Sequence, residues 1–183
     1  MKVHELFETE ERSILSVMGE QPEHYNGDFN CFSRKLTSLK GAPKTVNGDF
    51  YCYDNNLTSL KGAPTFVNGG FNCCDNDITS FEGASTTVNG YFWYNDNKLA
   101  SLHNIHKHNK EIGKTIWFAN NPITSHILGL LLIKKLKAIN IDLLTDYLLE
   151  ASKIINKHLS LDRDVIDCQE ELISAGLKEY AKL

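Results

Sequence analysis

Five cysteines and seven histidines are the residues of this 183-residue sequence from which nucleophilic or metal chemistry would start. Cys31, Cys52 and Cys73 recur every 21 residues, a spacing that would stack three thiols in adjacent copies of a repeat. Such a stack could act as a set of thiolate ligands. Tyr94 and Phe118 occupy the same position in later copies, however. The column is therefore interpreted as part of a hydrophobic core, in which cysteine acts as a small apolar residue.

Three histidines have the spacing H-x-x-H-x-H, at His103, His106 and His108. Imidazoles this close together can bind zinc. Glu111 is the one acidic residue close to them in the sequence, and no cysteine lies nearby. We therefore favour a polar recognition loop over a structural metal site.

One aspartate per repeat lies beside a recurring asparagine, at Asp54, Asp75 and Asp96. Carboxylates spaced about 5 Å apart in a row could attract calcium or a basic partner surface. Solvated turn aspartates are the simpler interpretation. No metal site is predicted here.

Motifs of the common enzyme classes are absent from the sequence. It contains no Gly-rich phosphate loop, no H-E-x-x-H, no nucleophile elbow and no C-x-x-C. Cys168 lies within a helical pattern and has no base that could be positioned to activate it. The sequence therefore predicts a protein that is not an enzyme and that carries no cofactor and no metal ion. Selective labelling of Cys168 by a thiol-reactive probe in the folded protein would revive a catalytic role.

A 21-residue repeat positions these side chains. The phrase Asn-Gly-x-Phe occurs at residues 26–29, 47–50, 68–71 and 89–92. Leu-Thr-Ser-Leu or a close variant follows each time, at 36–39, 57–60, 78–81 and 99–102. A fifth copy, from Ile112 to Ile123, comes into register if three residues are inserted between 103 and 111. Such a period indicates a solenoid, which we expect to begin near residue 13, with the preceding segment capping its open end.

Within one unit, Phe50 and Cys52 alternate with their neighbours and have apolar equivalents in every copy, so both should point inward from a short strand. Asn55 recurs as an asparagine ladder, whose side-chain amides can satisfy backbone groups that the turn leaves unpaired. Leu57 and Leu60 then fill the core. The expected fold is a leucine-rich-repeat solenoid, with a curved parallel sheet of about five strands and an irregular convex side.

The outward positions of the same strands are rich in aromatic residues. If Phe50 and Cys52 point inward, residues 49, 51 and 53 point onto the exposed face of the sheet. Large aromatic residues grouped on one surface are the usual anchors of binding hot spots. The alternative is that they favour strands and support one another across them. The predicted partner-binding residues are Phe32, Asp49, Tyr51, Tyr53, Asn72, Tyr91, Trp93, Asn95 and Trp117.

Residues 126–183 are expected to form a helical C-terminal cap, packed on the last repeat of a solenoid that spans residues 1–125. A first helix is predicted from Leu128, Leu132, Leu136 and Ile139. A second is predicted from Leu144, Tyr147, Leu148, Ala151, Ile154 and Ile155. A third should run from about Asp162 to Ala175, with Gly176 as its C-cap. Solenoids need such caps for solubility; docking or dimerisation is the alternative role.

The unit Phe-x-Cys-x-x-Asn-x-Leu-x-x-Leu resembles the leucine-rich-repeat consensus L-x-L-x-x-N-x-L-x-x-L over roughly residues 13–125. The version that continues Leu-Thr-Ser-Leu-Lys-Gly-Ala-Pro most resembles small leucine-rich-repeat proteins encoded by tailed bacteriophages. This resemblance implies a binding protein in the host cytoplasm whose partner is a bacterial host protein, such as a defence factor. The chain departs from bacterial effector repeats at Lys-Gly-Ala-Pro and at Ser33-Arg34, and it has no large catalytic domain, so ligase activity is not implied.

The charge and hydropathy of the chain argue against two classes of partner, nucleic acid and membranes. A net charge of -4, from 19 basic and 23 acidic residues spread along the chain, gives no basic stripe for nucleic acid. The longest apolar run is too short to span a bilayer, and the charged N-terminus does not resemble a signal peptide, so neither a membrane nor export is expected. We predict a non-catalytic, cytoplasmic protein–protein interaction module, and the sequence does not indicate its oligomeric state. The alternative is a sponge or lectin that binds a small molecule, nucleotide or glycan on the same aromatic face.

Overall fold

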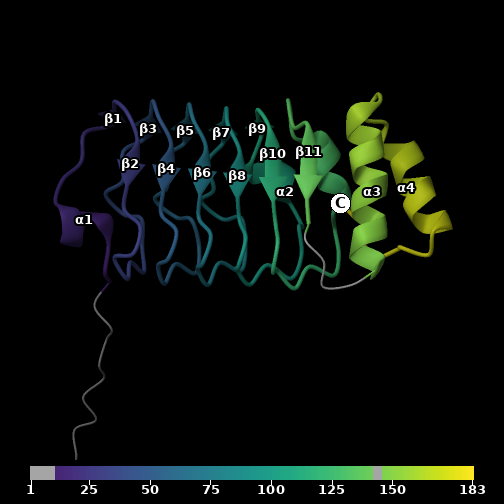
Figure 1. Ribbon diagram of the computed structural model, residues 1–183, viewed down its shortest axis with the longest axis horizontal. Coiled ribbons are helices and arrows are strands. Elements are labelled where there is room, and N and C mark those ends of the chain that lie inside the picture. Colours follow the sequence, from purple (N-terminus) through teal and green to yellow (C-terminus); the bar gives the residue numbers. More distant parts are fainter. Residues whose placement is uncertain (1–10, 142–145) are drawn as a thin grey trace, which may run out of the picture.

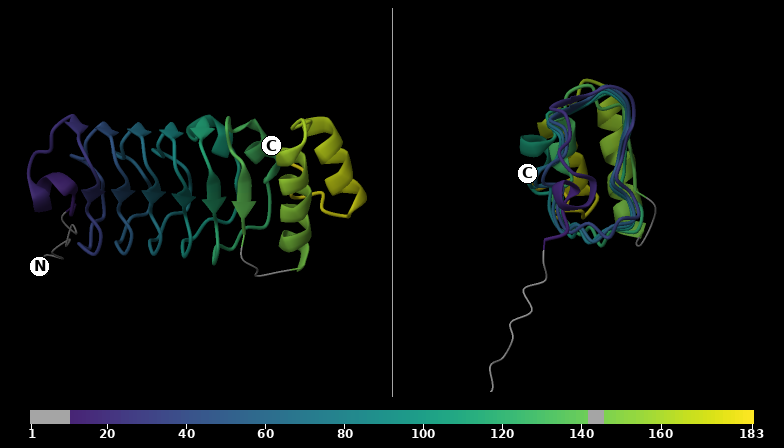
Figure 2. Two further views of the ribbon diagram at one scale, coloured as in Figure 1. Left: turned by 45° about the horizontal axis from the view of Figure 1, so that its top comes forward. Right: turned by 90° about the vertical axis from the view of Figure 1, so that its left-hand side faces the viewer.

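The computed structural model describes residues 11–141 and 146–183, and in this part of the chain a parallel β-solenoid is followed by helices at its C-terminal end (Figure 1). The repeat solenoid predicted from the 21-residue period is thus confirmed. Viewed along the solenoid axis, successive turns lie almost on top of one another (Figure 2). Of the described helices, none combines the length and the apolar character that a membrane span needs.

Two parallel sheets form the walls of the solenoid within the described residues. The outer-face sheet, as we call it below, contains β2 (Phe29–Asn30), β4 (Phe50–Tyr51), β6 (Phe71–Asn72), β8 (Phe92–Trp93), β10 (Thr115–Trp117) and β11 (Ala138–Asn140). A second sheet, which the sequence did not predict, contains β1 (His24–Tyr25), β3 (Thr45–Val46), β5 (Phe66–Val67), β7 (Thr87–Val88) and β9 (Glu111–Ile112). An Asn-Gly corner joins the two walls in the early turns.

The register of the outer-face sheet follows the sequence repeat. Phe29 pairs with Phe50, and Phe50 with Phe71, each 21 residues apart. The Phe rings are buried and in contact: the first pair is stacked with centroids 5.5 Å apart, and the second is tilted by 38° with centroids 4.9 Å apart. Cys52 is also fully buried, so the inward orientation predicted for Phe50 and Cys52 is confirmed.

The asparagine ladder is confirmed as well. Asn55 accepts hydrogen bonds through Oδ1 from the backbone N–H of Leu36, at 2.9 Å, and Nδ2 donates to the carbonyls of Cys52 and Cys31 at 2.9 and 3.0 Å. One buried amide therefore serves its own turn and the preceding one. Asn76, Asn97 and Asn121 repeat this arrangement.

The prediction of a first helix in the cap, from Leu128 to Ile139, is wrong. The region instead contains a short 3-10 helix, η1 (Leu128–Leu132), followed by β11, which pairs in parallel with β10 through Ile139 and Ile116. The solenoid sheet therefore continues beyond residue 125. The spacing of the leucines resembles that of a helix, because this further turn of the solenoid also buries residues that lie three or four positions apart in the sequence. Leu132, predicted on the buried face, is exposed.

The other two predicted helices are present as α3 (Asp146–Ser160) and α4 (Val165–Ser174). Ala151 and Ile155 are buried as expected, but Tyr147 is 70% exposed, and Leu144 lies outside the described residues. Gly176, at φ +80°, follows the C-cap Ala175, and its N–H donates to the carbonyl of Ile173 at 3.0 Å. The helix thus ends at a glycine as predicted, but Gly176 lies one residue after the C-cap rather than at it.

The two ends of the solenoid are closed differently. At the C-terminal end, α3 packs against β11, and α4 packs against α3 (Figure 1). At the N-terminal end lies α1 (Ile14–Met18), whose N-cap Ser13 forms reciprocal hydrogen bonds with Ser16. The expected N-terminal cap before residue 13 falls largely on residues outside the described part of the chain.

Candidate binding face on the outer-face sheet

All nine predicted partner-binding residues lie on strands of the outer-face sheet or within two residues of them, on the side away from the core. Phe32 and Tyr91 are exposed, by 39% and 38%, and the other predicted residues are half-buried. Their neighbours in the chain at the inward positions are buried. The side chains therefore form one outward surface, which we call the outer face: Phe32, Asp49, Tyr51, Tyr53, Asn72, Tyr91, Trp93, Asn95 and Trp117.

An N-terminal aromatic cluster consists of Phe32, Tyr51 and Tyr53. The Phe32 and Tyr53 rings stack with centroids 4.7 Å apart and an interplanar angle of 8°. Tyr51 meets Tyr53 edge-on at 6.4 Å. Offset and edge contacts of this kind contribute about 0.5–1.5 kcal/mol per pair. The rings support one another across strands, as the structural alternative predicted, yet they leave part of their surface open to solvent.

Tyr51 is also fixed by a polar contact. Its hydroxyl donates to Asp49 Oδ2 at 2.7 Å, and the N–H of Gly70 donates to the other oxygen, Oδ1, at 2.5 Å. The hydrogen bond to Asp49, followed by desolvation, raises the pKa of Tyr51 to about 12. Tyr51 therefore stays a neutral phenol and presents an oriented ring rather than a mobile one.

A C-terminal aromatic cluster consists of Tyr91, Trp93 and Trp117. The Tyr91 and Trp93 rings lie 5.4 Å apart, and Lys114 Nζ sits 4.7 Å from the centre of the Tyr91 ring. The Trp93 indole lies over Gly70 so closely that a Cβ there would come within 2.6 Å of it. Glycine at position 70 thus gives the indole its place on the sheet.

Trp117 has an unused hydrogen-bond donor. Its Nε1 is shielded from solvent and has no hydrogen-bond partner among the residues that the structure describes. Trp117 lies beside Trp93 on β8 and beside Asn140 on β11. A shielded donor without a partner is uncommon in a folded protein.

Small polar side chains separate and border the two clusters. Asn72 lies between Tyr51 and Trp93 in strand order, and its Oδ1 accepts a hydrogen bond from the N–H of Cys74 at 3.0 Å. Asn95 Oδ1 accepts one from the N–H of Ala119 at 2.9 Å. The outer face is therefore two aromatic clusters with amides between and beside them.

The row of Asp54, Asp75 and Asp96 borders the outer face, and all three are exposed. Each has a left-handed backbone with φ between 53° and 56°, which aspartate tolerates better than most residues. Partial burial, and then the charges of Asp96 and Asp54, raise the pKa of Asp75. Among the described residues no cluster of three or more potential ligands could hold a metal ion.

The histidine loop is folded into α2 (Ile105–His108), with Ile105 and Asn109 buried at its two ends. The His103 ring meets His126 edge-on at 5.0 Å, and its Nδ1 lies 3.2 Å from the backbone oxygen of Leu183. Desolvation lowers the pKa of His106. The loop is thus tied to the end of the chain.

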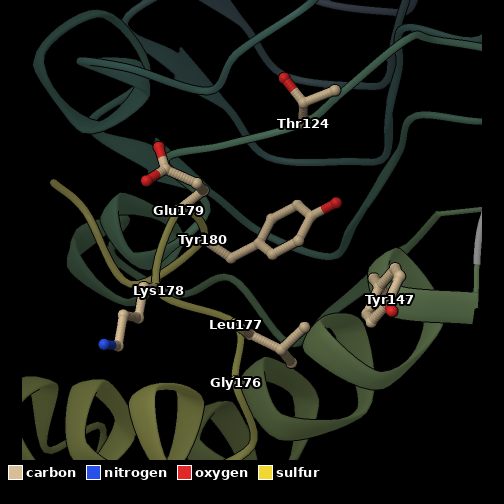
Figure 3. A pocket seen from close by; sticks show the side chains of 7 residues that line it. All are labelled: Thr124, Tyr147, Gly176, Leu177, Lys178, Glu179 and Tyr180. Atoms are coloured by element: carbon tan, nitrogen blue, oxygen red, sulfur yellow. The ribbon is translucent and has the colours of Figure 1, made fainter.

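Sequence reasoning missed a cavity of about 280 Å³ between the last turns of the solenoid and the cap. Figure 3 shows the Tyr180 ring extending between Thr124 and Tyr147, with Leu177 below it. The signal in the sequence was Tyr147, which was assigned to the buried side of its helix. A mostly apolar hollow beside two tyrosines can accept a small apolar group.

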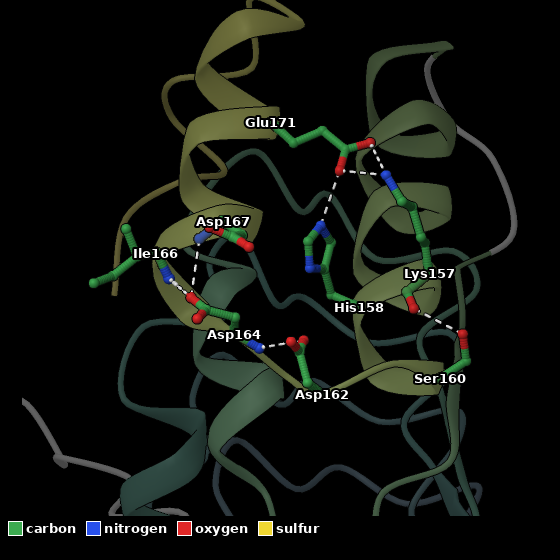
Figure 4. A network of polar contacts seen from close by, with 8 residues as sticks. All are labelled: Lys157, His158, Ser160, Asp162, Asp164, Ile166, Asp167 and Glu171. Atoms are coloured by element: carbon green, nitrogen blue, oxygen red, sulfur yellow. Dashed lines mark hydrogen bonds and ion pairs between the residues drawn. The ribbon is translucent and has the colours of Figure 1, made fainter.

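Cys168 does not have the surroundings of a nucleophile. It is buried, and desolvation raises its pKa to about 12, so the thiol keeps its proton. The nearby polar network is used to join α3 to α4: Glu171 Oε2 lies 2.7 Å from Lys157 Nζ and 2.9 Å from His158 Nε2 (Figure 4). The hydrogen bond with Lys157, followed by that with His158, lowers the pKa of Glu171.

Comparisons with protein families, with curated proteins and with solved structures find no match to this chain. The resemblance to leucine-rich repeats and to bacteriophage proteins therefore stays a prediction.

Proposed function

We propose that this chain is a non-catalytic binding module that captures another protein on its outer face. The observation that carries the proposal is the pair of aromatic clusters, held at fixed positions on one surface by a rigid stack of strands. Aromatic side chains lose little conformational entropy on binding and dominate the energetics of protein interfaces.

The form of the surface favours a protein over a small ligand. Small molecules are bound in concave sites that enclose most of their surface. The cavity beside Tyr180 is lined by cap residues and Thr124, and a second cavity lies beside α1; neither includes a residue of the outer face. Binding of a nucleotide, glycan or other small molecule by stacking is the second candidate, supported by the exposed surfaces of Phe32 and Tyr91.

The acidic row suggests the charge of the partner. Asp54 directly follows Tyr53, so its carboxylate borders the N-terminal aromatic cluster. Partial burial, and then repulsion from Asp96 and Asp54, raise the pKa of Asp75, and an arginine or lysine of the partner would relieve the repulsion. We infer a partner that offers apolar side chains flanked by basic ones. From sequence resemblance alone, we infer a bacterial host protein met in the cytoplasm.

The test is an affinity capture from bacterial lysate with three forms of the protein. The first is the wild type, and the second carries Tyr51→Ala, Trp93→Ala and Trp117→Ala. The matched control removes three cap residues that are 63–70% exposed: Tyr147→Ala, Leu161→Ala and Ile166→Ala. Circular dichroism checks that all three are folded.

A stoichiometric protein retained by the wild type and the control but lost from the outer-face variant supports the proposal. Loss from the control alone would move the site to the cap. Equal recovery by all three forms would contradict the proposal, and capture of no protein would favour the small-ligand candidate.

A further inference from the structure

We propose that two copies of this chain pair head to head through the open edge of β2, with Asn30 of one copy opposite Asn30 of the other. This inference is independent of what the outer face binds.

The outward edge of β2 has unused backbone groups. The N–H groups of Phe29, Cys31 and Ser33 donate to carbonyls of the next turn at 2.8, 2.9 and 3.2 Å. In a strand, alternate residues direct their backbone groups to opposite edges. The N–H groups of Asn30 and Phe32, and the carbonyls of Asp28 and Asn30, therefore point away from β4, and no described residue bonds to them.

The opposite end of the outer-face sheet is sealed by side chains. The N–H of Ile139 donates to Asn156 Oδ1 at 2.8 Å, and Asn156 Nδ2 donates to the carbonyl of Ile139 at 3.0 Å. Arg163 donates to the carbonyls of Ile133 and Leu136 just before β11. Because one end is sealed and the other is open, pairing between copies stops at two and cannot continue into a fibre.

The N-terminal helix leaves the β2 edge open. Leu15 on α1 donates its N–H to the carbonyl of Lys40 at 3.0 Å, and Ser13 bridges to Ser38, so the helix covers the part of the first turn that follows β2. Figure 1 shows α1 beside the lower part of this turn and away from β1 and the β2 arrow. Residues 28–32 contain no proline, lysine or bulge of the kind that blocks an edge.

Charge favours a two-fold, antiparallel arrangement of the two edges. Asp28 lies at the start of the exposed edge, and Arg34 and Lys35 follow its end. With Asn30 opposite Asn30 of the second copy, Asp28 lies opposite Phe32 of that copy, at the end of the pairing beyond which Arg34 and Lys35 follow. Unlike charges are brought together at both ends of the pairing, whereas a parallel strand of the same sequence would align like charges.

The same rotation also covers β1. Around the first turn, β1 precedes β2, and the segment under α1 follows it. A half-turn about an axis through Asn30 exchanges these two sides, so α1 of each copy comes to lie over β1 of the other. The exposed apolar side chain Leu15, at 41%, belongs to this helix. The two outer-face sheets become continuous, with both outer faces on the same side.

Sedimentation velocity over a range of concentrations tests the proposal, with Asn30→Pro against Asn30→Ala as the matched pair. Proline removes the N–H at the two-fold axis and is tolerated on edge strands. The expected result is twice the 20.7 kDa chain mass at high concentration for the wild type and Asn30→Ala, and the single mass for folded Asn30→Pro. A wild type that stays monomeric, or a dimer that persists in Asn30→Pro, would overturn the proposal.

Disulfide trapping provides a test that does not depend on proline. Facing residues in a hydrogen-bonded antiparallel pair have Cα atoms about 5.5 Å apart, within the range of a disulfide. In a Cys74→Ser background, Asn30→Cys should give a covalent dimer on mild oxidation. Asn72→Cys, at the same repeat position two turns further in, should not. Equal trapping of both variants, or of neither, would contradict the pairing.

Discussion

The side chain of Asn156 pairs with both backbone groups of Ile139. It accepts from the N–H at 2.8 Å and donates to the carbonyl at 3.0 Å, so an amide on α3 takes the place of the next strand beside β11. Open sheet edges invite pairing with other chains, and natural proteins cover them. One side chain thus fixes the helical cap to the end of the solenoid.

We expect Asn156→Ala to destabilise the protein by about 1–3 kcal/mol, because two nearly buried backbone groups of Ile139 lose their partner. Urea unfolding would measure this change. Lys153→Ala, on the exposed side of the same helix, is the control and should change stability by less than about 0.5 kcal/mol. Equal effects of the two substitutions would contradict this role of Asn156.

The ladder asparagines should be the most sensitive polar residues. Asn76 Oδ1 accepts from the N–H of Leu57 at 2.9 Å, and Nδ2 donates to the carbonyls of Cys52 and Cys73. Asn76→Ala leaves several buried groups unpaired, so we expect a loss of about 3 kcal/mol or more in urea unfolding. Asn72→Ala, four residues earlier on the outer face, should cost much less. A mild effect at Asn76 would refute the ladder as a stabilising element.

Acid should weaken the junction between α3 and α4. The contacts with Lys157 and His158 hold the pKa of Glu171 below the ordinary value of a glutamate. A carboxyl whose folded pKa is depressed contributes stability above its unfolded pKa and loses it as the pH falls through the folded value. The difference in Tm between the wild type and Glu171→Gln should therefore be constant at neutral pH and shrink below about pH 4.5. A difference independent of pH would exclude this contribution.

Thiol labelling should separate Cys74 from the other cysteines. Cys74 is half-buried, whereas Cys168 is buried with a pKa raised to about 12. In the folded protein we expect slow alkylation of Cys74 alone, and fast alkylation of all five cysteines after denaturation. Mass spectrometry of the peptides would assign the sites. Labelling of Cys168 in the folded protein would reopen the question of a reactive thiol.

The repeat explains which parts of this structure are predictable. Phe50, Cys52 and Asn55 have equivalents in several copies, so their inward positions and the ladder follow from the sequence. The turn through Ala138 and Ile139 was missed because it lacks the Asn-Gly-x-Phe phrase, although it buries the same positions. The strands of the second sheet each bury one residue at most, such as Val46 in β3, so they lack the pair of alternating apolar residues that indicates the strands of the outer-face sheet.

Contacts made only once leave no repeated signal. Asn156 and Arg163 seal the C-terminal edge through hydrogen bonds to residues 17 to 30 positions away. A helical pattern places Asn156 on a face but does not indicate which backbone groups it meets. Tyr147 fits an apolar stripe by its spacing, yet it lies at the start of α3 and is exposed beside the Tyr180 cavity.

The most direct test of the outer face as a protein-binding surface is photo-crosslinking in bacterial lysate. A photoreactive phenylalanine analogue would replace Tyr53 in one form of the protein and Tyr147 in another. The proposal predicts that one host protein is crosslinked from position 53, that it is not crosslinked from position 147, and that the Trp93→Ala, Trp117→Ala double substitution abolishes the crosslink. Crosslinking from position 147 but not from position 53, or a crosslink from position 53 that survives the double substitution, would contradict it.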